Sequence, residues 1–171
     1  MYDVGDLIIY GSEGVCRVES VGAAPVSGAD KGRLYYTLSP LYRTGHVFTP
    51  VDSGVFMRPV ISRQEALDLI KQIPDIEGEI YETRNLRFLT EHYQECFQSH
   101  KCYDLVKLIK DVYLKRKCAI AKGKKLGQID ERFMKRAEDM LYGELAVALG
   151  IPKDDVSGYI AESVEAAAET N

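Results

Sequence analysis

The sequence predicts an α+β protein, in which an N-terminal Tudor-like or SH3-like β barrel is followed by an all-α helical bundle. Over the first 60 residues, short β-branched and aromatic runs alternate with Gly, Pro, Ser and Asp, which is typical of a small antiparallel sheet or barrel. From Ser62 onward, apolar residues recur at helical spacing instead. No internal repeat interrupts this order, so the change of period divides the chain into two parts.

Five strands are expected in the first part. Their apolar runs recur about every 8 to 12 residues, as in SH3-like and Tudor-like barrels. Glycine-containing stretches separate several of the runs, because glycine accepts the backbone angles that tight turns need. The strands are predicted near residues 6–10, 16–21, 34–39, 46–50 and 55–59, with turns at 11–14, 27–32 and 43–45.

The second part begins with a helix whose start is marked by the capping box Ser62-Arg-Gln-Glu65. Pro74 stops this helix, and a short linker follows. Apolar periodicity then predicts helices near residues 86–97, 103–118 and 130–149, and a last helix from Pro152, at its first turn, to about residue 166. The predicted divisions are therefore 1–60 for the barrel, 61–78 for a helix and linker, and 79–171 for the helical domain.

The composition is ordinary for a globular protein, with 46% hydrophobic and 28% charged residues. No apolar run approaches the roughly 18 residues that a membrane span needs, and the start of the chain lacks the features of a secretory signal. A cytoplasmic protein is expected. The four cysteines form no CxxC pair and the three histidines lack zinc-ligand spacing, which favours structural, reduced thiols and no metal site.

Motifs of the common enzyme classes are missing from the sequence. It has no GxxxxGK[ST] phosphate loop, no GxGxxG after a strand, no GxSxG and no HExxH. Carboxylate pairs such as Asp154 with Asp155 are interpreted as solvated charges on helix faces. We therefore expect a protein that is not an enzyme and needs no cofactor.

The net charge of −4 hides a strong segregation along the chain. Residues 84–136 carry 14 basic and 6 acidic side chains, a balance of +8, whereas residues 137–171 carry 1 basic and 8 acidic, a balance of −7. A basic block between acidic flanks favours binding to a polyanion such as nucleic acid.

Within this block, Arg84 and Arg87 are three residues apart and are expected to share a helix face. Leu86 lies between them, and its spacing from later apolar residues favours a place in the core. Further on, Lys115, Arg116 and Lys117 end one helix and Lys122, Lys124 and Lys125 follow in a loop. Such side chains attract the DNA backbone, but the helix dipole also favours cations at a C-terminus. Both interpretations stay open for residues 115–117, and the loop lysines favour nucleic acid.

Two stretches carry a family resemblance. The first is Tyr2-Asp-Val-Gly-Asp-Leu-Ile-Ile-Tyr10, followed by Gly14-Val-Cys-Arg-Val18, Tyr35-Tyr-Thr-Leu38 and Phe48-Thr-Pro50, and the second is Met140-Leu-Tyr-Gly-Glu-Leu-Ala146. They resemble the CarD family of bacterial RNA-polymerase-binding regulators, whose N-terminal domain is shared with the transcription-repair coupling factor. In order, spacing and length, the resemblance covers essentially the whole chain.

The resemblance implies a Tudor-like domain that docks on the RNA polymerase β subunit. By register, the polymerase-binding positions fall at Ala24, Pro25, Val26, Val47 and Phe48. Several related proteins have arginines in these strands, so the contact chemistry of this chain must differ. The resemblance also implies a helical domain that lies against the upstream edge of the melted promoter.

Better-known members place a tryptophan at the start of the first long helix as a minor-groove wedge. The matching position here is Leu86, after Asn85, and the chain has no tryptophan. A leucine can unstack base steps, but it lacks the aromatic area and the indole donor, so a weaker or altered effect on the bubble is predicted. The predicted DNA-binding set is Arg84, Asn85, Leu86, Arg87, Lys115, Arg116, Lys122, Lys124 and Lys125.

The sequence is therefore interpreted as that of a monomeric transcription regulator, associated with the nucleoid through RNA polymerase. It is expected to bind the polymerase β subunit and promoter DNA, largely without sequence specificity, and to modulate the stability of open complexes. The alternative is an adaptor that binds polymerase and a second protein without contacting DNA.

Overall fold

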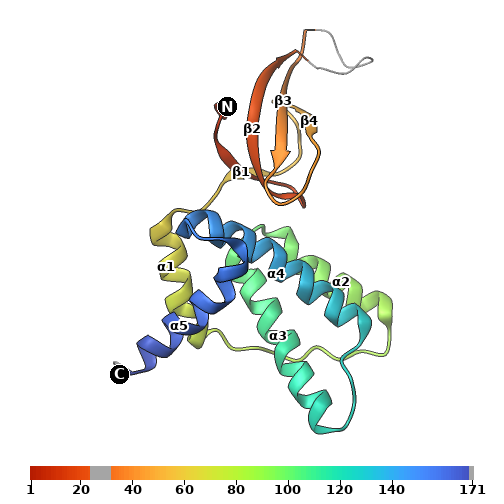
Figure 1. Cartoon of the computed structure of the whole chain (residues 1–171). Helices are drawn as coiled ribbons and strands as arrows, with labels where there is room; N and C mark the ends of the chain where they lie inside the picture. Colours follow the sequence, from red (N-terminus) through yellow and green to blue (C-terminus); the bar gives the residue numbers. More distant parts are fainter. Residues whose placement is uncertain (24–31, 170–171) are drawn as a thin grey trace. The chain divides into compact units, whose positions relative to one another are not determined.

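The computed structural model describes the backbone of residues 1–23 and 32–169. The chain divides into two units, Met1–Ile61 and Ser62–Asn171. Figure 1 shows that the first unit is built from strands and the second from helices. The α+β class predicted from the sequence is confirmed.

The first unit is a five-stranded antiparallel sheet with the order β4-β3-β2-β1-β5. All five predicted strands are present: β1 is Leu7–Tyr10, β2 is Gly14–Ala23, β3 is Leu34–Pro40, β4 is Val47–Pro50 and β5 is Met57–Pro59. Among the described residues, β4 and β5 do not pair with each other. The sheet therefore keeps two edges, formed by strands of four and three residues, and the predicted barrel is not closed.

One face of the sheet covers a small hydrophobic core. Since successive side chains of a strand point to opposite faces, alternate residues enter it. The buried cluster consists of Ile8, Cys16, Val18, Tyr36 and Leu38, with Val47 among the partly buried residues packed against it. Burial raises the pKa of the Cys16 thiol to about 11.

The second unit contains five α-helices and two 3-10 turns within its described residues: α1 (Arg63–Gln72), η1 (Ile73–Asp75), α2 (Leu86–Gln98), α3 (Cys102–Ala121), α4 (Gln128–Leu149), η2 (Lys153–Asp155) and α5 (Val156–Glu169). The capping box of α1 is confirmed, because Ser62 and Glu65 exchange side-chain to backbone hydrogen bonds of 3.1 Å in both directions. The last helix begins later than predicted, since η2 separates it from Pro152.

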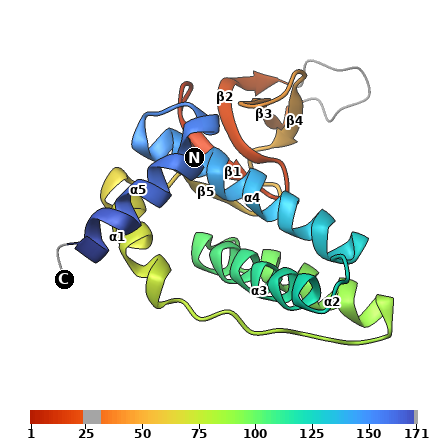
Figure 2. The ribbon, with the colours of Figure 1, turned by 60° about the horizontal axis from the view of Figure 1, so that its bottom comes forward.

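Helix α4 is the centre of the second unit. Helices α1, α2, α3 and α5 all pack against it, and α1 and α5 also pack against each other. Figures 1 and 2 show α1 beside α5 at one end of α4 and α2 near its other end. None of the described helices is long and apolar enough to cross a lipid bilayer.

An extended segment, residues 76–85, connects η1 to α2 and runs along α3 (Figure 2). The Lys110 ammonium of α3 donates to the carbonyl oxygens of Ile73 and Ile76. Gly78 lies so close to α3 that an added Cβ would be 2.9 Å from the Lys110 carbonyl oxygen. The segment is therefore held by side chains of α3 instead of by a β-ladder.

Candidate nucleic-acid interface

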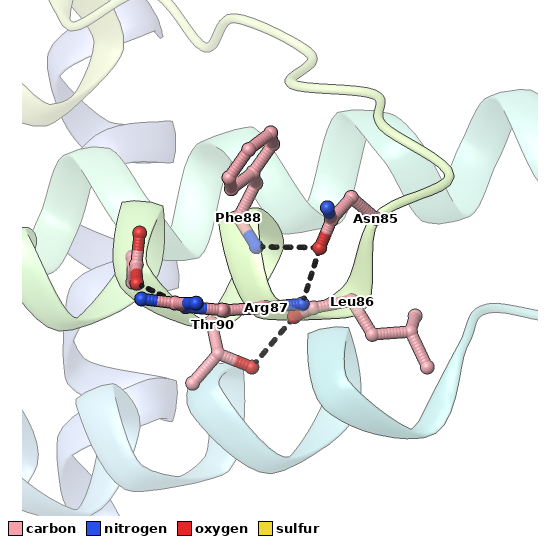
Figure 3. Close-up of polar contacts among 6 residues, drawn as sticks. Asn85, Leu86, Arg87, Phe88 and Thr90 are labelled. Atoms are coloured by element: carbon pink, nitrogen blue, oxygen red, sulfur yellow. Dashed lines mark hydrogen bonds and ion pairs between the residues drawn. The ribbon is translucent and has the colours of Figure 1, made fainter.

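The start of α2 is fixed by the side chain of Asn85. This residue has an extended backbone, and its Oδ1 accepts hydrogen bonds from the amides of Arg87 at 3.0 Å and Phe88 at 3.3 Å (Figure 3). Asn is one of the preferred residues at this position, because its side chain satisfies amides that have no partner within the helix. Asn85 thus sets where the helix begins and which residue comes first.

Leu86 is that first residue, and its side chain is 63% exposed. The core position that periodicity favoured for Leu86 is wrong. The Cα–Cβ bonds of a helix tilt toward its N-terminus, so a side chain in the first turn projects past the packed part of the helix, and Figure 3 shows Leu86 pointing away from α2. Burial on α2 begins one turn later, with Leu89, Tyr93 and Phe97.

Arg84 and Arg87 flank this leucine, and both are exposed. Arg84 precedes the N-cap, so it lies outside the helix, and the expectation that the two arginines share a helix face is wrong. Arg87 pairs with Glu91 at 3.0 Å across one turn of the exposed surface. An exposed pair of this kind contributes little to stability, and the Arg87 guanidinium can exchange Glu91 for another anion at low cost.

Lys115 has a different environment from the other predicted phosphate ligands. Its ammonium donates to Asp130 Oδ1 at 3.0 Å and to the Tyr81 carbonyl oxygen at 3.2 Å, and its side chain is only 18% exposed. Asp130 is buried and also accepts a hydrogen bond from the Tyr93 hydroxyl. Burial, followed by this hydrogen bond, raises the pKa of Tyr93. Lys115 therefore joins the extended segment, α3 and α4.

The remaining basic candidates lie at the end of α3 and in the loop behind it. Arg116 is half-buried on α3, near enough to Glu138 of α4 that its charge opposes the burial that raises the pKa of that carboxyl. Lys122, Lys124 and Lys125 are exposed. They share the wall of one pocket with Glu82, which lies two residues before Arg84. The extended segment before α2, the end of α3, the basic loop and the start of α4 therefore meet at this pocket.

Sequence reasoning missed two residues that hold this end together. Asp130 was predicted only as the start of a helix, and Tyr81 was given no role. Tyr81 stacks on His92 of α2, with ring centroids 3.9 Å apart and planes 8° apart. This contact could be found only from the fold, because no local sequence pattern marks Tyr81 as a stacking partner of His92.

In the first unit, the two predicted polymerase contacts on β4 face opposite sides of the sheet. Val47 packs against the hydrophobic core, whereas Phe48 is 40% exposed and pairs across the sheet with Thr37. Ala24, Pro25 and Val26 lie outside the described residues. Of this predicted set, Phe48 is the side chain that the described structure presents to a partner.

Residues 2–61 match the family model of the CarD-like/TRCF RID domain. The first unit is a CarD-like RID domain. The matched residues coincide with all but the first residue of the unit, and they contain the whole of the first stretch that carried the resemblance, from Tyr2 to Pro50. The RID family interacts with the β subunit of RNA polymerase. No curated protein matches the chain, and the match to the RID domain ends before the helical unit begins.

Proposed function

We propose that this protein is a bacterial transcription regulator of the CarD type, which acts in the cytoplasm as a monomer without catalysing a reaction. The RID domain docks on the β subunit of RNA polymerase, and the helical unit binds promoter DNA at the upstream edge of the melted region. Binding at that edge changes the lifetime of the open complex. The RID family match supports the polymerase half of this proposal.

The observation that supports the DNA half most directly is the exposure of Leu86. A single exposed leucine is common on protein surfaces, but this one is placed by a capped helix start between two exposed arginines. Minor-groove proteins use this combination, in which an apolar wedge enters between base steps and adjacent cations bind the phosphates. Leu86 is proposed as the wedge.

The side chain of leucine is small for this role. It can separate base pairs, but it cannot stack on a base or donate a hydrogen bond as an indole does. Phe88, which follows Arg87, is 53% exposed. It could supply the aromatic area that Leu86 lacks. The proposal therefore includes Phe88 as a second apolar contact.

On the polymerase side, the proposal assigns Phe48 to the contact and Val47 to the core of the RID domain. Aromatic side chains near the centre of an interface often contribute most of its binding energy. The substitution Phe48→Ala should weaken polymerase binding and leave the fold intact, whereas Val47→Ala should destabilise the domain through the packing that it loses.

The test is the open-complex lifetime on a ribosomal-type promoter with cognate polymerase. Wild type is compared with Leu86→Ala and with the double variant Arg84→Ala/Arg87→Ala. Leu114→Ala serves as the matched control, because Leu114 is an exposed leucine of α3 that the proposal does not place on DNA. The expected result is that wild type changes the lifetime, that both test variants lose most of the effect, and that the control keeps it.

Polymerase binding by each variant must be measured in parallel. If all variants bind polymerase and none of them, wild type included, alters the open complex or binds DNA, the DNA half of the proposal is refuted. The protein would then be an adaptor whose helical unit binds another protein.

A further inference from the structure

A pocket of about 260 Å³ lies at the end of the helical unit where the basic residues gather. It is walled by the extended segment, the last turns of α3, the loop and the start of α4. Four lysines are among the residues that line it, namely Lys115, Lys122, Lys124 and Lys125. Its volume lies just below the range of about 300–1,000 Å³ typical of small-molecule sites, so it fits a compact ligand.

The backbone that carries these lysines has a defined conformation. Gly123 is in the left-handed region with φ of 71°. The Lys124 amide donates to the Ala119 carbonyl at 2.8 Å, and the Gly123 amide donates to Ile120 at 2.9 Å. These two bonds form a Schellman motif, which ends α3 and reverses the chain. The motif places Lys122 and Lys124 on the same pocket wall, so their convergence is built into the fold.

The charges in the pocket are not balanced. Lys115 is neutralised by Asp130, with which it forms an ion pair of 3.0 Å. For Lys122, Lys124 and Lys125, the described structure records no ion pair, and the only other carboxylate in the wall is that of Glu82. Cations held close together repel one another, and a bound anion removes that cost.

The helix dipole explains only part of this arrangement. It favours a cation in the last turn of α3, but the effect falls off beyond that turn, where Lys124 and Lys125 lie. At the other wall, Gly127 is the N-cap of α4 and has no side chain that could accept from the first amides of the helix. The lysines are the observation that carries the inference, because Asp130 and Glu131 in the first turn of α4 offset the positive end of that helix.

We propose that this pocket is a binding site for a phosphate group. The ligand could be a phosphate of the DNA backbone or that of a free phosphate compound, and both have the same chemistry: a compact, multiply charged oxyanion that accepts hydrogen bonds from several ammonium groups. The site deepens the proposed DNA function if the phosphate comes from DNA, but its existence does not depend on that function.

The first experiment titrates the full chain with inorganic pyrophosphate by isothermal calorimetry at low ionic strength. Wild type is compared with Lys124→Gln/Lys125→Gln and with a matched control, Lys117→Gln/Lys135→Gln, which removes two exposed lysines outside the pocket wall. One charge-assisted hydrogen bond contributes about tenfold or more in affinity. The pocket variant should therefore bind at least about tenfold more weakly, whereas the control should bind within about threefold of wild type.

Absence of pyrophosphate binding, or equal weakening in the pocket variant and the control, would overturn the proposal, because the lysines would then act only as diffuse surface charge. Amide chemical shifts locate the bound anion independently. Shifts are expected at Leu126 and Gly127, which line the pocket, and shifts elsewhere without these two would also overturn the proposal.

A second arm distinguishes the source of the phosphate. Pyrophosphate is added to a complex of the protein with a fluorescent promoter duplex. Displacement of the duplex at concentrations that fill the pocket identifies a backbone phosphate as the ligand. Binding of pyrophosphate without displacement identifies a free phosphate compound, and this result leaves the pocket standing even where the DNA proposal fails.

Discussion

Replacement of Lys115 by methionine removes one ammonium group and keeps nearly the same side-chain length. In the folded protein that ammonium donates to Asp130 and to the Tyr81 carbonyl, at 3.0 and 3.2 Å. The variant leaves the buried Asp130 carboxylate, which is 3% exposed, with the hydrogen bond that it accepts from the Tyr93 hydroxyl. The Tyr81 carbonyl loses the bond that fixes the extended segment before α2.

The expected cost follows from these contacts. Removing one partner of a fully buried ion pair costs about 3–5 kcal/mol, because the other charge stays buried. The Lys115 side chain is 18% exposed, so solvent reaches the pair and reduces that figure to about 2–3 kcal/mol. With a urea m value of about 1–3 kcal/mol/M for a domain of this size, the midpoint of helix unfolding should fall by roughly 1–2 M.

The assay is urea unfolding followed by the helical circular dichroism signal. Lys117→Met is the matched control, since the Lys117 ammonium lies 5.5 Å above the Tyr113 ring on the exposed face of α3, where a cation contributes about 0.5–1 kcal/mol at most. A loss below about 1 kcal/mol for Lys115→Met, no larger than that of the control, would refute the structural role.

DNA binding separates this role from a direct phosphate contact. Loss of one phosphate contact reduces the slope of log affinity against log salt by about one. For Lys115→Met we expect an unchanged slope and a uniform drop in affinity, caused by the displaced α2. A slope reduced by about one would show that Lys115 binds a phosphate, as the sequence alone predicted.

Three further predictions concern stability. Asn85→Ala should destabilise the helical unit by about 1 kcal/mol, because two amides at the start of α2 lose their acceptor, and Asn85→Asp should restore thermal stability in a melting experiment. Gly78→Ala should cost about 1–3 kcal/mol in urea unfolding, because the added Cβ would collide with the Lys110 backbone. Gly158→Ala is the control: the glycine lies in helix α5, the added Cβ would have no neighbour within 4 Å, and the change should be neutral or stabilising. Burial raises the pKa of the Cys16 thiol from 9.0 to about 11 in the folded state. The contribution of the protonated thiol to the free energy of unfolding is therefore complete below pH 9, and it is lost as the pH rises toward 11. The loss amounts to roughly 3 kcal/mol, and Cys16→Val should reduce the fall in unfolding free energy between about pH 8 and pH 10.5. An identical fall in both proteins would contradict this assignment.

The positions of strands and helices were predictable because their signals are local. Alternation of apolar residues marks a strand within a few residues, and the capping box of Ser62 marks a helix start within four. Closure of the sheet was not predictable in the same way. It depends on whether β4 pairs with β5, and no sequence feature of these two strands indicates how far apart they lie.

The candidate site was predictable in composition but not in geometry. The basic block and Leu86 were identified, yet the partners of Lys115 lie 15 and 34 residues away along the chain, and no local pattern separates a buried lysine from an exposed one. The error on Arg84 was avoidable. Asn is favoured at the N-cap, so Asn85 was a signal that the helix starts after Arg84.

The edges of the RID sheet bear on how copies of this protein avoid pairing with one another. An exposed strand edge offers unpaired amides and carbonyls to any other extended chain, and natural sheets limit this risk with short edge strands and proline. Both edge strands here follow that pattern, since β4 has four residues and ends at Pro50, and β5 has three and ends at Pro59. A chain that added itself to either edge would gain few backbone hydrogen bonds. Crowded copies of this protein thus have little to gain from sheet extension, and a specific partner must recognise side chains.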